Sequence, residues 1–250
     1  MKNSNRYRNS SDFRMKNGIF VSRNLGVALR IKEGGYIPKS GLLLANVLDY
    51  CPIQGRVLDI GTGEIGFLAH YLLSAGASVV FASDIDEYTI EHASQSSDNS
   101  SNIKWIISDV FSGITELDLD LIISNPPQMP CESGGYNDHD FGGDDGRNII
   151  LRIISNSSNY MVFGGHLIIL CFDFLGVESR FNSQKSIMEI ARDFGFKALV
   201  LGRFPHVIRR GGKTEENLDW IRKIYPRYEF KKTPENNFSH EIIILELTKW

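Results

Sequence analysis

The sequence predicts an α/β fold built on a seven-stranded, doubly wound and mostly parallel sheet. Short apolar runs alternate with segments whose apolar residues recur at helical spacing, which is the pattern of strand–helix–strand units. Several of these runs are apolar throughout, for example 121–123 and 167–170, as expected for strands covered on both faces. With 250 residues, the chain is long enough for one such domain with appendages.

The chain is expected to consist of a basic N-terminal extension, residues 1–35, and a main domain, residues 36–250. In the extension, 17–30 is expected to form a helix, which gives a short N-terminal helical extension suited to act as a lid. Strands of the main domain are expected at 56–60, 78–82, 103–107, 119–124, 166–172, 198–203 and 241–247. Helices are expected at 65–74, 87–94, 148–161 and 183–194. An excursion at about 205–237, with a further helix at 214–224, separates the last two strands, and such long connections often carry specificity.

The net charge of −3 conceals an uneven distribution. Residues 1–39 carry nine Lys or Arg against two acidic residues, and residues 197–232 carry ten against four. Residues 40–196 carry seven against twenty-one. Two basic flanks therefore bracket an acidic middle. They are compatible with ordinary solvated surface, and equally with one face that meets an anionic partner such as RNA or DNA.

Composition also bears on location and metal content. The three cysteines, Cys51, Cys131 and Cys171, are widely spaced and odd in number, which favours reduced thiols in a cytoplasmic protein. No apolar stretch reaches membrane-spanning length, and the N-terminus lacks the apolar core of a secretory signal, so no membrane partner is expected. The six histidines are scattered and no Cys/His pair has zinc-ligand spacing, so no metal is expected.

A glycine-rich loop, Gly61-Thr62-Gly63-Glu64-Ile65-Gly66, follows the first strand of the main domain and opens a helix. It formally fits the dinucleotide pattern G-x-G-x-x-G, and Asp84 after the next strand is suitably spaced to bind ribose hydroxyls. An NAD-dependent oxidoreductase is therefore one interpretation. Asp59, two residues before the first glycine, argues against it, because a carboxylate repels a pyrophosphate and attracts a cofactor with a cationic amino group. The chain also lacks a recognisable proton-relay His or Tyr/Lys pair.

These segments resemble the motifs of class I S-adenosylmethionine-dependent methyltransferases, which share a Rossmann-like fold. Residues 57–63 look like their first motif, residues 83–86 like their second, and residues 108–111 are similar to the segment that brackets the adenine. The resemblance implies S-adenosyl-L-methionine as the cofactor. It places the methionyl part of the cofactor against the loop residues Gly61, Thr62 and Gly63, with its ammonium group near Asp59. The ribose is expected to lie against Asp84. The adenine is expected to lie against Ile85, Asp109 and Val110.

The segment Asn125-Pro126-Pro127-Gln128 directly follows an apolar strand. It resembles the (D/N)-P-P-(aromatic) motif of amino-group methyltransferases, which modify a nitrogen of adenine, cytosine or a glutamine side chain. Such a nitrogen is a poor nucleophile because its lone pair is delocalised. The Asn125 side-chain carbonyl and the Pro126 carbonyl can each accept one N–H, which aims the lone pair at the sulfonium methyl, while the prolines fix the backbone. Positioning supplies much of the rate without a dedicated strong base. We therefore expect all four residues to be catalytic, with Asn125 also beside the cofactor.

The pattern is most similar to that of the protein-(glutamine-N5) methyltransferases that act on release factors. Residues 35–44 look like their pre-motif segment, which packs beside the cofactor and here supplies Tyr36 and Pro38, and residues 141–147 resemble the glycine-acid-glycine stretch after their catalytic loop. There are two departures. Gln128 stands where an aromatic ring would stack on a planar acceptor, a contact of ~1 kcal/mol or more. Only about 35 residues precede the pre-motif in this sequence, so we expect the N-terminal helical domain of bacterial members to be absent.

N-methylation of an amide or amine nitrogen is the leading hypothesis, with Gln128, Tyr136 and His139 as candidates for acceptor recognition. Three acceptor classes stay open: a protein glutamine, a small amino-acid-like metabolite, and RNA or DNA bound by the basic flanks and by the aromatic residues of the excursion. The same site could instead cyclise the cofactor to azetidine-2-carboxylate with release of methylthioadenosine, or the chain could be a non-catalytic cofactor-binding subunit. The sequence leaves oligomeric state and pathway open.

Overall fold

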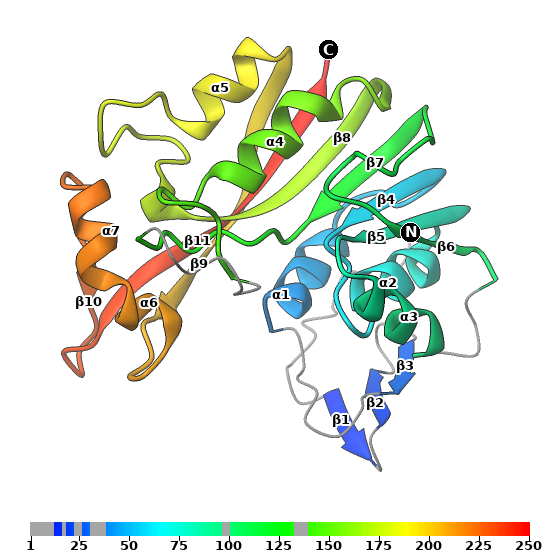
Figure 1. The fold of residues 1–250 in the computed structure, drawn as a ribbon, viewed down its shortest axis with the longest axis horizontal. Coiled ribbons are helices and arrows are strands. Elements are labelled where there is room, and N and C mark those ends of the chain that lie inside the picture. The colour runs from blue at the N-terminus through cyan, green and yellow to red at the C-terminus, as the bar shows by residue number, and fades with distance from the viewer. Residues whose placement is uncertain (1–12, 17–18, 23–26, 31–38, 97–100, 133–139) are drawn as a thin grey trace. The chain divides into compact units, whose positions relative to one another are not determined.

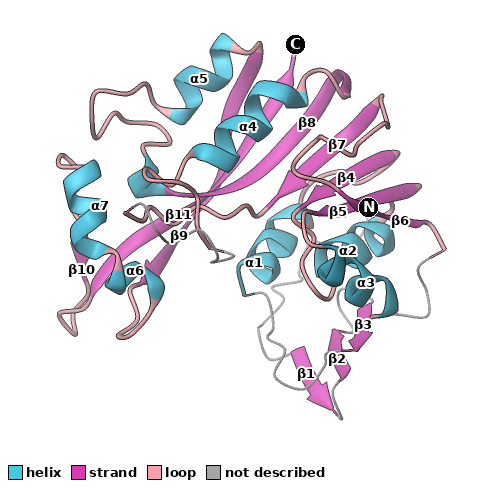
Figure 2. Ribbon diagram, in the orientation of Figure 1, coloured by secondary structure: helices cyan, strands magenta, loops and turns pink. Residues whose placement is uncertain are grey.

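The computed structural model describes residues 13–16, 19–22, 27–30, 39–96, 101–132 and 140–250. The chain divides into two compact units, Met1–Ile114 and Thr115–Trp250 (Figure 1). Short strands and helices alternate in the first unit, whereas three strands of twelve residues each dominate the second (Figure 2). Within these residues, none of the helices combines the length and the apolarity that crossing a membrane requires.

Three parallel strands form the main sheet of the first unit, in the order β4 (Arg56–Ile60), β5 (Val79–Asp84) and β6 (Ile103–Ile107). The helices of this unit are α1 (Lys39–Leu48), α2 (Phe67–Ala75) and α3 (Glu87–Gln95). The strand registers set Ile60 beside Ser83 and Asp84 beside Ile107. The carboxyl ends of all three strands therefore lie at one edge, which is where open α/β sheets bind ligands.

The described N-terminal residues form an antiparallel sheet of three strands, β1 (Phe13–Lys16), β2 (Ile19–Ser22) and β3 (Val27–Arg30). The expected helix over 17–30, and with it the helical extension, is therefore wrong for the described part of this segment. Ile19 and Val27 are β-branched and favour strands, while the two glycines of the segment lower its helix propensity. The Arg30 amide donates to the Ser96 carbonyl at 2.7 Å, which ties β3 to the end of α3.

The second unit is built on paired strands in the order β7 (Leu119–Ser124), β8 (Met161–Phe172), β11 (Phe238–Lys249) and β9 (Phe196–Val207). The β7–β8 pair is parallel and the other pairs are antiparallel, including the short strand β10 (Lys231–Lys232) against β11. The helices of this unit are α4 (Asn148–Ser157), the 3-10 helix η2 (Asp173–Leu175), α5 (Ile187–Asp193), α6 (Lys213–Glu216) and α7 (Leu218–Ile224).

All seven expected strands are present across the two units, and the α/β class with mostly parallel order in the early strands is confirmed. Some boundaries differ. Strands β9 and β11 run well beyond the expected ends because they pair along their whole lengths, from Ser239 with Val207 to Lys249 with Phe196. Pro205 lies inside β9, where it is tolerated because β9 pairs with β11 alone among the described strands.

A reciprocal cap begins helix α5. The Ser186 hydroxyl accepts the Glu189 amide at 3.2 Å, and the Glu189 carboxylate accepts the Ser186 amide at 2.8 Å. Two backbone donors that have no partner inside the helix are thereby satisfied.

We expect Ser186→Ala to lower the free energy of unfolding by about 1 kcal/mol, because it removes one of these two hydrogen bonds. Urea denaturation followed by circular dichroism measures the change. Ser183→Ala, at an exposed serine three residues earlier, is the control and should change stability by less than about 0.5 kcal/mol. Equal effects of the two substitutions would contradict this account of the cap.

Candidate active site

The glycine-rich loop between β4 and α2 leaves open space beside its first two glycines. Gly61 and Gly63 have φ angles of +77° and +69°, a region that favours glycine, and no heavy atom of the described residues lies within 4 Å of where a Cβ would stand. Gly66 differs, since a Cβ there would lie 2.5 Å from the Trp105 ring. The first two glycines therefore expose backbone, and the third allows close packing.

The loop is fastened to the end of β5. The Thr62 amide donates to the Ser83 carbonyl at 2.9 Å, and the Gly63 amide donates to Oδ2 of Asp84 at 3.1 Å. The other oxygen of Asp84 accepts the Asp86 amide at 3.3 Å, while the Asp86 side chain caps α3. Asp84, the last residue of β5, thus faces the glycine loop, with its orientation fixed by two backbone amides.

Asp59 lies completely buried at the end of β4. Its Oδ2 accepts the Thr62 hydroxyl at 2.7 Å, and its Oδ1 has no hydrogen-bond partner among the described residues. Burial raises the pKa of Asp59 to about 7, against the lowering effect of the Thr62 hydroxyl and with a smaller contribution from the Asp84 charge. A buried carboxyl group with one unused oxygen is suited to receive an ammonium group.

The turn after β6 extends the same edge. The Ser108 amide donates to the Asp84 carbonyl at 2.8 Å, and the Ser108 hydroxyl donates to the Val110 carbonyl at 3.0 Å. Val110 is buried at φ +57°, a conformation that β-branched residues rarely adopt, and Asp109 beside it is partly exposed. Ile85 is 67% exposed, so an apolar side chain is available at this edge.

These features fit S-adenosyl-L-methionine. The open space beside Gly61 and Gly63 admits a ligand against the backbone, the unused oxygen of Asp59 suits a ligand ammonium, and the fixed carboxylate of Asp84 suits vicinal ribose hydroxyls. The roles assigned to these residues and to Ile85 stay predictions.

Four predicted site residues lie outside the described residues: Tyr36, Pro38, Tyr136 and His139. Their roles also remain predictions. Within the described ranges, no group of three or more His, Cys, Asp or Glu side chains is arranged to hold a metal ion.

The acceptor loop, residues 125–128, begins where the β7–β8 ladder ends, at the pair Ser124 and Ile169. Beyond that pair, the Gln128 side chain continues the ladder. Its Nε2 donates to the Leu170 carbonyl at 3.1 Å, and its Oε1 accepts the Phe172 amide at 2.7 Å. These are the two groups that a continuing parallel strand would bond. A side-chain amide therefore replaces a backbone peptide group of β7.

This geometry changes the interpretation of Gln128. The residue is buried and both polar atoms of its amide are engaged on β8, so its side chain is turned to the sheet rather than offered to an acceptor. Nε2 also donates to the Pro126 carbonyl at 3.3 Å, which holds in place the carbonyl expected to orient the acceptor. The place of the stacking aromatic residue is thus taken by a residue that completes the sheet.

A second segment clamps the acceptor loop from outside. The Asp140 carbonyl accepts the Gln128 amide at 3.1 Å and the Met129 amide at 2.8 Å, and the Gly142 amide donates to the Met129 carbonyl at 3.0 Å. A Cβ on Gly142 would lie 2.5 Å from the Cα of Gln128, and one on Gly146 would lie 2.6 Å from the Gln128 carbonyl oxygen. The glycines of the 141–147 segment therefore allow this close approach.

The aromatic residues of the excursion belong to the fold. Tyr225 is buried and Phe230 lies edge-on to Tyr228, with ring centroids 4.9 Å apart. The polar atoms of Trp220, Tyr225 and Tyr228 donate, at 2.5–2.9 Å, to oxygens of Asp144, Asp145 and Asp173. These three side chains are therefore not arranged as a stacking platform for bases.

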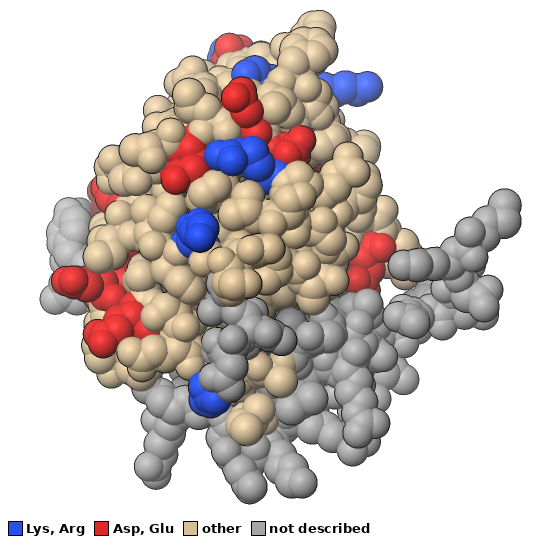
Figure 3. All heavy atoms as spheres, turned by 90° about the vertical axis from the view of Figure 1, so that its right-hand side faces the viewer, with Lys and Arg blue, Asp and Glu red and all other residues tan. Residues whose placement is uncertain are grey.

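The second basic flank is partly neutralised by neighbouring acids. Ion pairs between described residues involve five of its ten basic residues: Arg203, Lys213, Arg222, Lys223 and Lys231. On the face shown in Figure 3, which is not the one that carries α6 and α7, the coloured basic and acidic side chains are interspersed. Much of the first flank lies outside the described residues. The prediction of a nucleic-acid partner gains no support from the described part.

The fold, the open glycine loop and the two acids at its edge define a class I S-adenosylmethionine-dependent methyltransferase. The chain belongs to the methyltransferase small domain family, whose model matches residues 37–200. It is a methyltransferase that uses S-adenosyl-L-methionine as its cofactor.

Curated relatives are named for glutamine methylation. The chain is 30% identical over 187 residues to a "Putative protein N5-glutamine methyltransferase" of Methanocaldococcus jannaschii, covering 71% of this chain and 89% of the relative. It is 28% identical over 189 residues to the ribosomal protein uL3 glutamine methyltransferase of Francisella tularensis, covering 68% of this chain. The match spans only 57% of that second relative.

Solved structures support the fold. One is a 16S rRNA N2 G1207 methyltransferase of T. thermophilus in complex with AdoMet and guanosine, with a TM-score of 0.56 and 17% sequence identity. The match covers 93% of this chain and 50% of the chain in that structure. Another is the YcgJ protein from Bacillus, with a TM-score of 0.55 and 13% sequence identity. That match covers 84% of this chain and 98% of the YcgJ chain. At these identities the likeness concerns the fold alone.

We expect Asp59→Asn to change both stability and cofactor binding. The folded pKa of about 7 exceeds the ordinary 3.8, so the unfolding free energy of the cofactor-free wild type should fall as pH rises from 4 to 7. The variant should lose this dependence and be the more stable protein at pH 8. Its affinity for S-adenosylmethionine should fall about tenfold or more, because a charged hydrogen bond is lost.

Thermal melts between pH 4 and 8 and calorimetric titration with the cofactor measure the two effects. Glu91→Gln, at an exposed carboxylate on α3, removes the same charge as a control and should leave both properties unchanged. Wild-type affinity in Asp59→Asn would contradict the assignment of Asp59.

We expect Gln128→Tyr to destabilise the second unit, although it restores the aromatic residue of the family motif. The change leaves the Leu170 carbonyl and the Phe172 amide without their partner, at about 1–3 kcal/mol for each group that stays buried. A lowered midpoint in urea denaturation tests this. Gln95→Tyr, at an exposed position on α3, is the matched control and should shift stability by about 0.5 kcal/mol or less. A Gln128→Tyr protein as stable as wild type would refute the ladder role.

Proposed function

We propose that this enzyme methylates the side-chain amide nitrogen of a glutamine residue in a protein substrate. The similarity to relatives named for glutamine methylation carries the proposal, above all the 30% identity to the Methanocaldococcus jannaschii protein over 89% of its length. The chemistry of residues 125–128 supports it independently, because two carbonyl acceptors, on the Asn125 side chain and the Pro126 backbone, match the two N–H groups of a primary amide.

In this proposal the chain acts on the nitrogen by orientation. The Asn125 side-chain carbonyl and the Pro126 backbone carbonyl each accept one N–H of the amide, which turns the nitrogen lone pair out of conjugation. The Pro126 carbonyl is already held from the other side by Gln128 at 3.3 Å, and the two prolines restrict the backbone. When bound, S-adenosylmethionine supplies a methyl group on a positively charged sulfur.

Three alternatives have weaker support. A small metabolite as acceptor was suggested in part, and cyclisation of the cofactor mainly, by the absence of an aromatic residue at position 128, and the bonds of Gln128 to β8 give that absence a structural reason. An RNA or DNA acceptor was suggested by the two basic flanks and by aromatic residues of the excursion, three of which donate hydrogen bonds within the second unit.

The test is methyl labelling of a proteome from cells that lack the enzyme, with tritiated S-adenosylmethionine. Label on a glutamine amide should be released as methylamine by acid hydrolysis, because the amide bond breaks and the N–CH₃ bond survives. The small-molecule product should be S-adenosylhomocysteine. Label that is sensitive to ribonuclease, or formation of methylthioadenosine, would contradict the proposal.

We expect Asn125→Ala to lower kcat on the order of 100-fold, because one of the two acceptors that orient the nitrogen is lost. Single-turnover assays with the labelled substrate measure this. Asn156→Ala, at an exposed position on α4, should retain full activity. An Asn125→Ala enzyme with undiminished kcat would refute the orienting role.

A further inference from the structure

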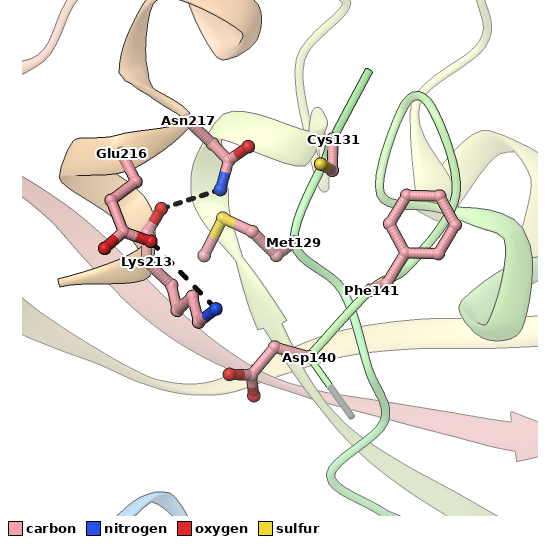
Figure 4. Close-up of a pocket in the computed structure, with 7 residues that line it drawn as sticks. All are labelled: Met129, Cys131, Asp140, Phe141, Lys213, Glu216 and Asn217. Carbon is pink, nitrogen blue, oxygen red and sulfur yellow. Dashed lines mark hydrogen bonds and ion pairs between the residues drawn. The ribbon is translucent and has the colours of Figure 1, made fainter. Parts of the chain in front are cut away.

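The excursion faces the clamping segment, residues 140–147, across a pocket of about 280 Å³ (Figure 4). Met129 and Asp140 line one side of this pocket, and Lys213 and Glu216 of helix α6 line the other. In Figure 4 the Lys213 ammonium lies between the carboxylates of Asp140 and Glu216. Because a pocket separates α6 from the acceptor loop, close packing of α6 is not what holds the clamping segment at this point.

Two hydrogen bonds join helix α7 to the clamping segment. The Trp220 indole N–H donates to the Asp144 carbonyl at 2.8 Å, and the Tyr225 hydroxyl donates to the Asp145 carbonyl at 2.5 Å. Tyr225 directly follows α7 and is buried. Burial raises the pKa of the Tyr225 hydroxyl, so this donor keeps its proton. Both acceptors are backbone groups, so the two bonds restrain the path of the chain itself.

A neighbouring ion pair is a weaker restraint. Lys223 of α7 and Glu132, four residues beyond the end of the acceptor loop, are 3.8 Å apart, and their side chains are 67% and 72% exposed. Solvent screens such a pair and the two long side chains keep much of their freedom, so the pair contributes little. The hydrogen bonds of Trp220 and Tyr225 are therefore the contacts of α7 that matter for the clamping segment.

The turn that carries the two acceptor carbonyls is itself closed by hydrogen bonds. The Gly146 amide donates to the Gly143 carbonyl at 3.0 Å. The two oxygens of the Asp145 side chain accept the Arg147 amide at 2.9 Å and the Gln184 side-chain amide at 3.1 Å. A displacement of Asp145 is therefore passed along the clamping segment and is not absorbed within the turn.

The other end of the clamping segment holds the acceptor loop. The Asp140 carbonyl accepts the Gln128 and Met129 amides, and the Gly142 amide donates to the Met129 carbonyl, at 2.8–3.1 Å. The Gln128 side chain in turn donates to the Pro126 carbonyl at 3.3 Å. A series of hydrogen bonds and short backbone segments therefore leads from helix α7 to one of the two carbonyl groups expected to orient the acceptor.

We infer that Trp220 and Tyr225 are positioning residues for methyl transfer. They hold the clamping segment and, through it, the acceptor loop, residues 125–128. This inference rests on the proposed function, and it assigns the excursion a role in the rate of the reaction. Misplacement of orienting groups by about 1 Å can lower a rate on the order of 100-fold, so hydrogen bonds remote from the reacting atoms can control turnover.

Two matched substitutions test the inference. Tyr225→Phe removes the hydrogen bond to the clamping segment, and Tyr228→Phe is its control. Both hydroxyls belong to the excursion and both are hydrogen-bonded, but Tyr228 donates to the Asp173 side chain, which lies outside the clamping segment. Trp220→Phe removes the second bond, and a double variant combines it with Tyr225→Phe.

Hydrogen exchange measures the restraint without any acceptor. In Tyr225→Phe we expect the Gln128 and Met129 amides to exchange about fivefold faster or more, while amides of the β8–β11 ladder keep their rates. Tyr228→Phe should leave the exchange of Gln128 and Met129 within about twofold of wild type. Unchanged exchange in the double variant, or an equal rise in the ladder amides, overturns the inference.

Turnover measures the consequence. Tritiated S-adenosylmethionine is varied against a fixed amount of proteome from cells that lack the enzyme. Tyr225→Phe should lower the apparent kcat about tenfold or more and change the apparent KM for S-adenosylmethionine less than about twofold, because the predicted cofactor loop belongs to the first unit. An undiminished kcat in Tyr225→Phe, or an equal loss in Tyr228→Phe, overturns the inference.

The outcomes separate this inference from the proposed function. Faster exchange and slower turnover, with label that is sensitive to ribonuclease, support the positioning role and count against a glutamine acceptor. Label on glutamine amides with unchanged exchange refutes the positioning role alone. Neither faster exchange nor labelled glutamine counts against both.

Discussion

Burial of the Asp59 carboxyl group is the main energetic constraint on the first unit, which contains the predicted cofactor loop. A carboxyl group at the end of an apolar strand costs free energy unless it has partners, and here the Thr62 hydroxyl satisfies only one oxygen. This costly carboxyl group lies near Gly61 and Gly63, which leave the backbone open, and near a second acid, Asp84. A ligand that brings a cation to this place would offset the cost, so we predict that cofactor binding and folding stability are coupled in the first unit.

The second unit meets a different requirement, which is stiffness. Under the proposed function, orienting an amide nitrogen demands carbonyl groups that do not move, yet the acceptor loop begins where a strand ends and the β7–β8 pairing stops. The chain restores pairing with the Gln128 side chain and adds the Asp140 and Gly142 clamp on the outer side. Prolines alone would limit the backbone angles of the loop without anchoring it to the sheet.

The sequence reveals features whose cause is local. The strand–loop–helix units, the exposed glycines and the acid at the end of β5 follow from short patterns, and the structure has them where they are expected. Residues 17–30 were misassigned because their apolar spacing suits a helix as well as two strands, and only pairing decides between them. The role of Gln128 depends on partners 42 and 44 residues away, and the pocket depends on α6 much further along the chain. No local pattern reports such contacts.

The Gln128 side-chain amide completes the hydrogen bonding of β8, so this residue contributes to the fold and not to contacts with the acceptor. In the aromatic form of the motif, one residue at the fourth loop position can both end the loop and discriminate between flat acceptors. Here the side chain at that position is bonded to β8, so it presents no aromatic ring to an acceptor, and we expect selectivity to depend on other residues. Exposed loop residues can vary without endangering the fold. The range of substrates can therefore drift during evolution while the methyl-transfer chemistry stays constant.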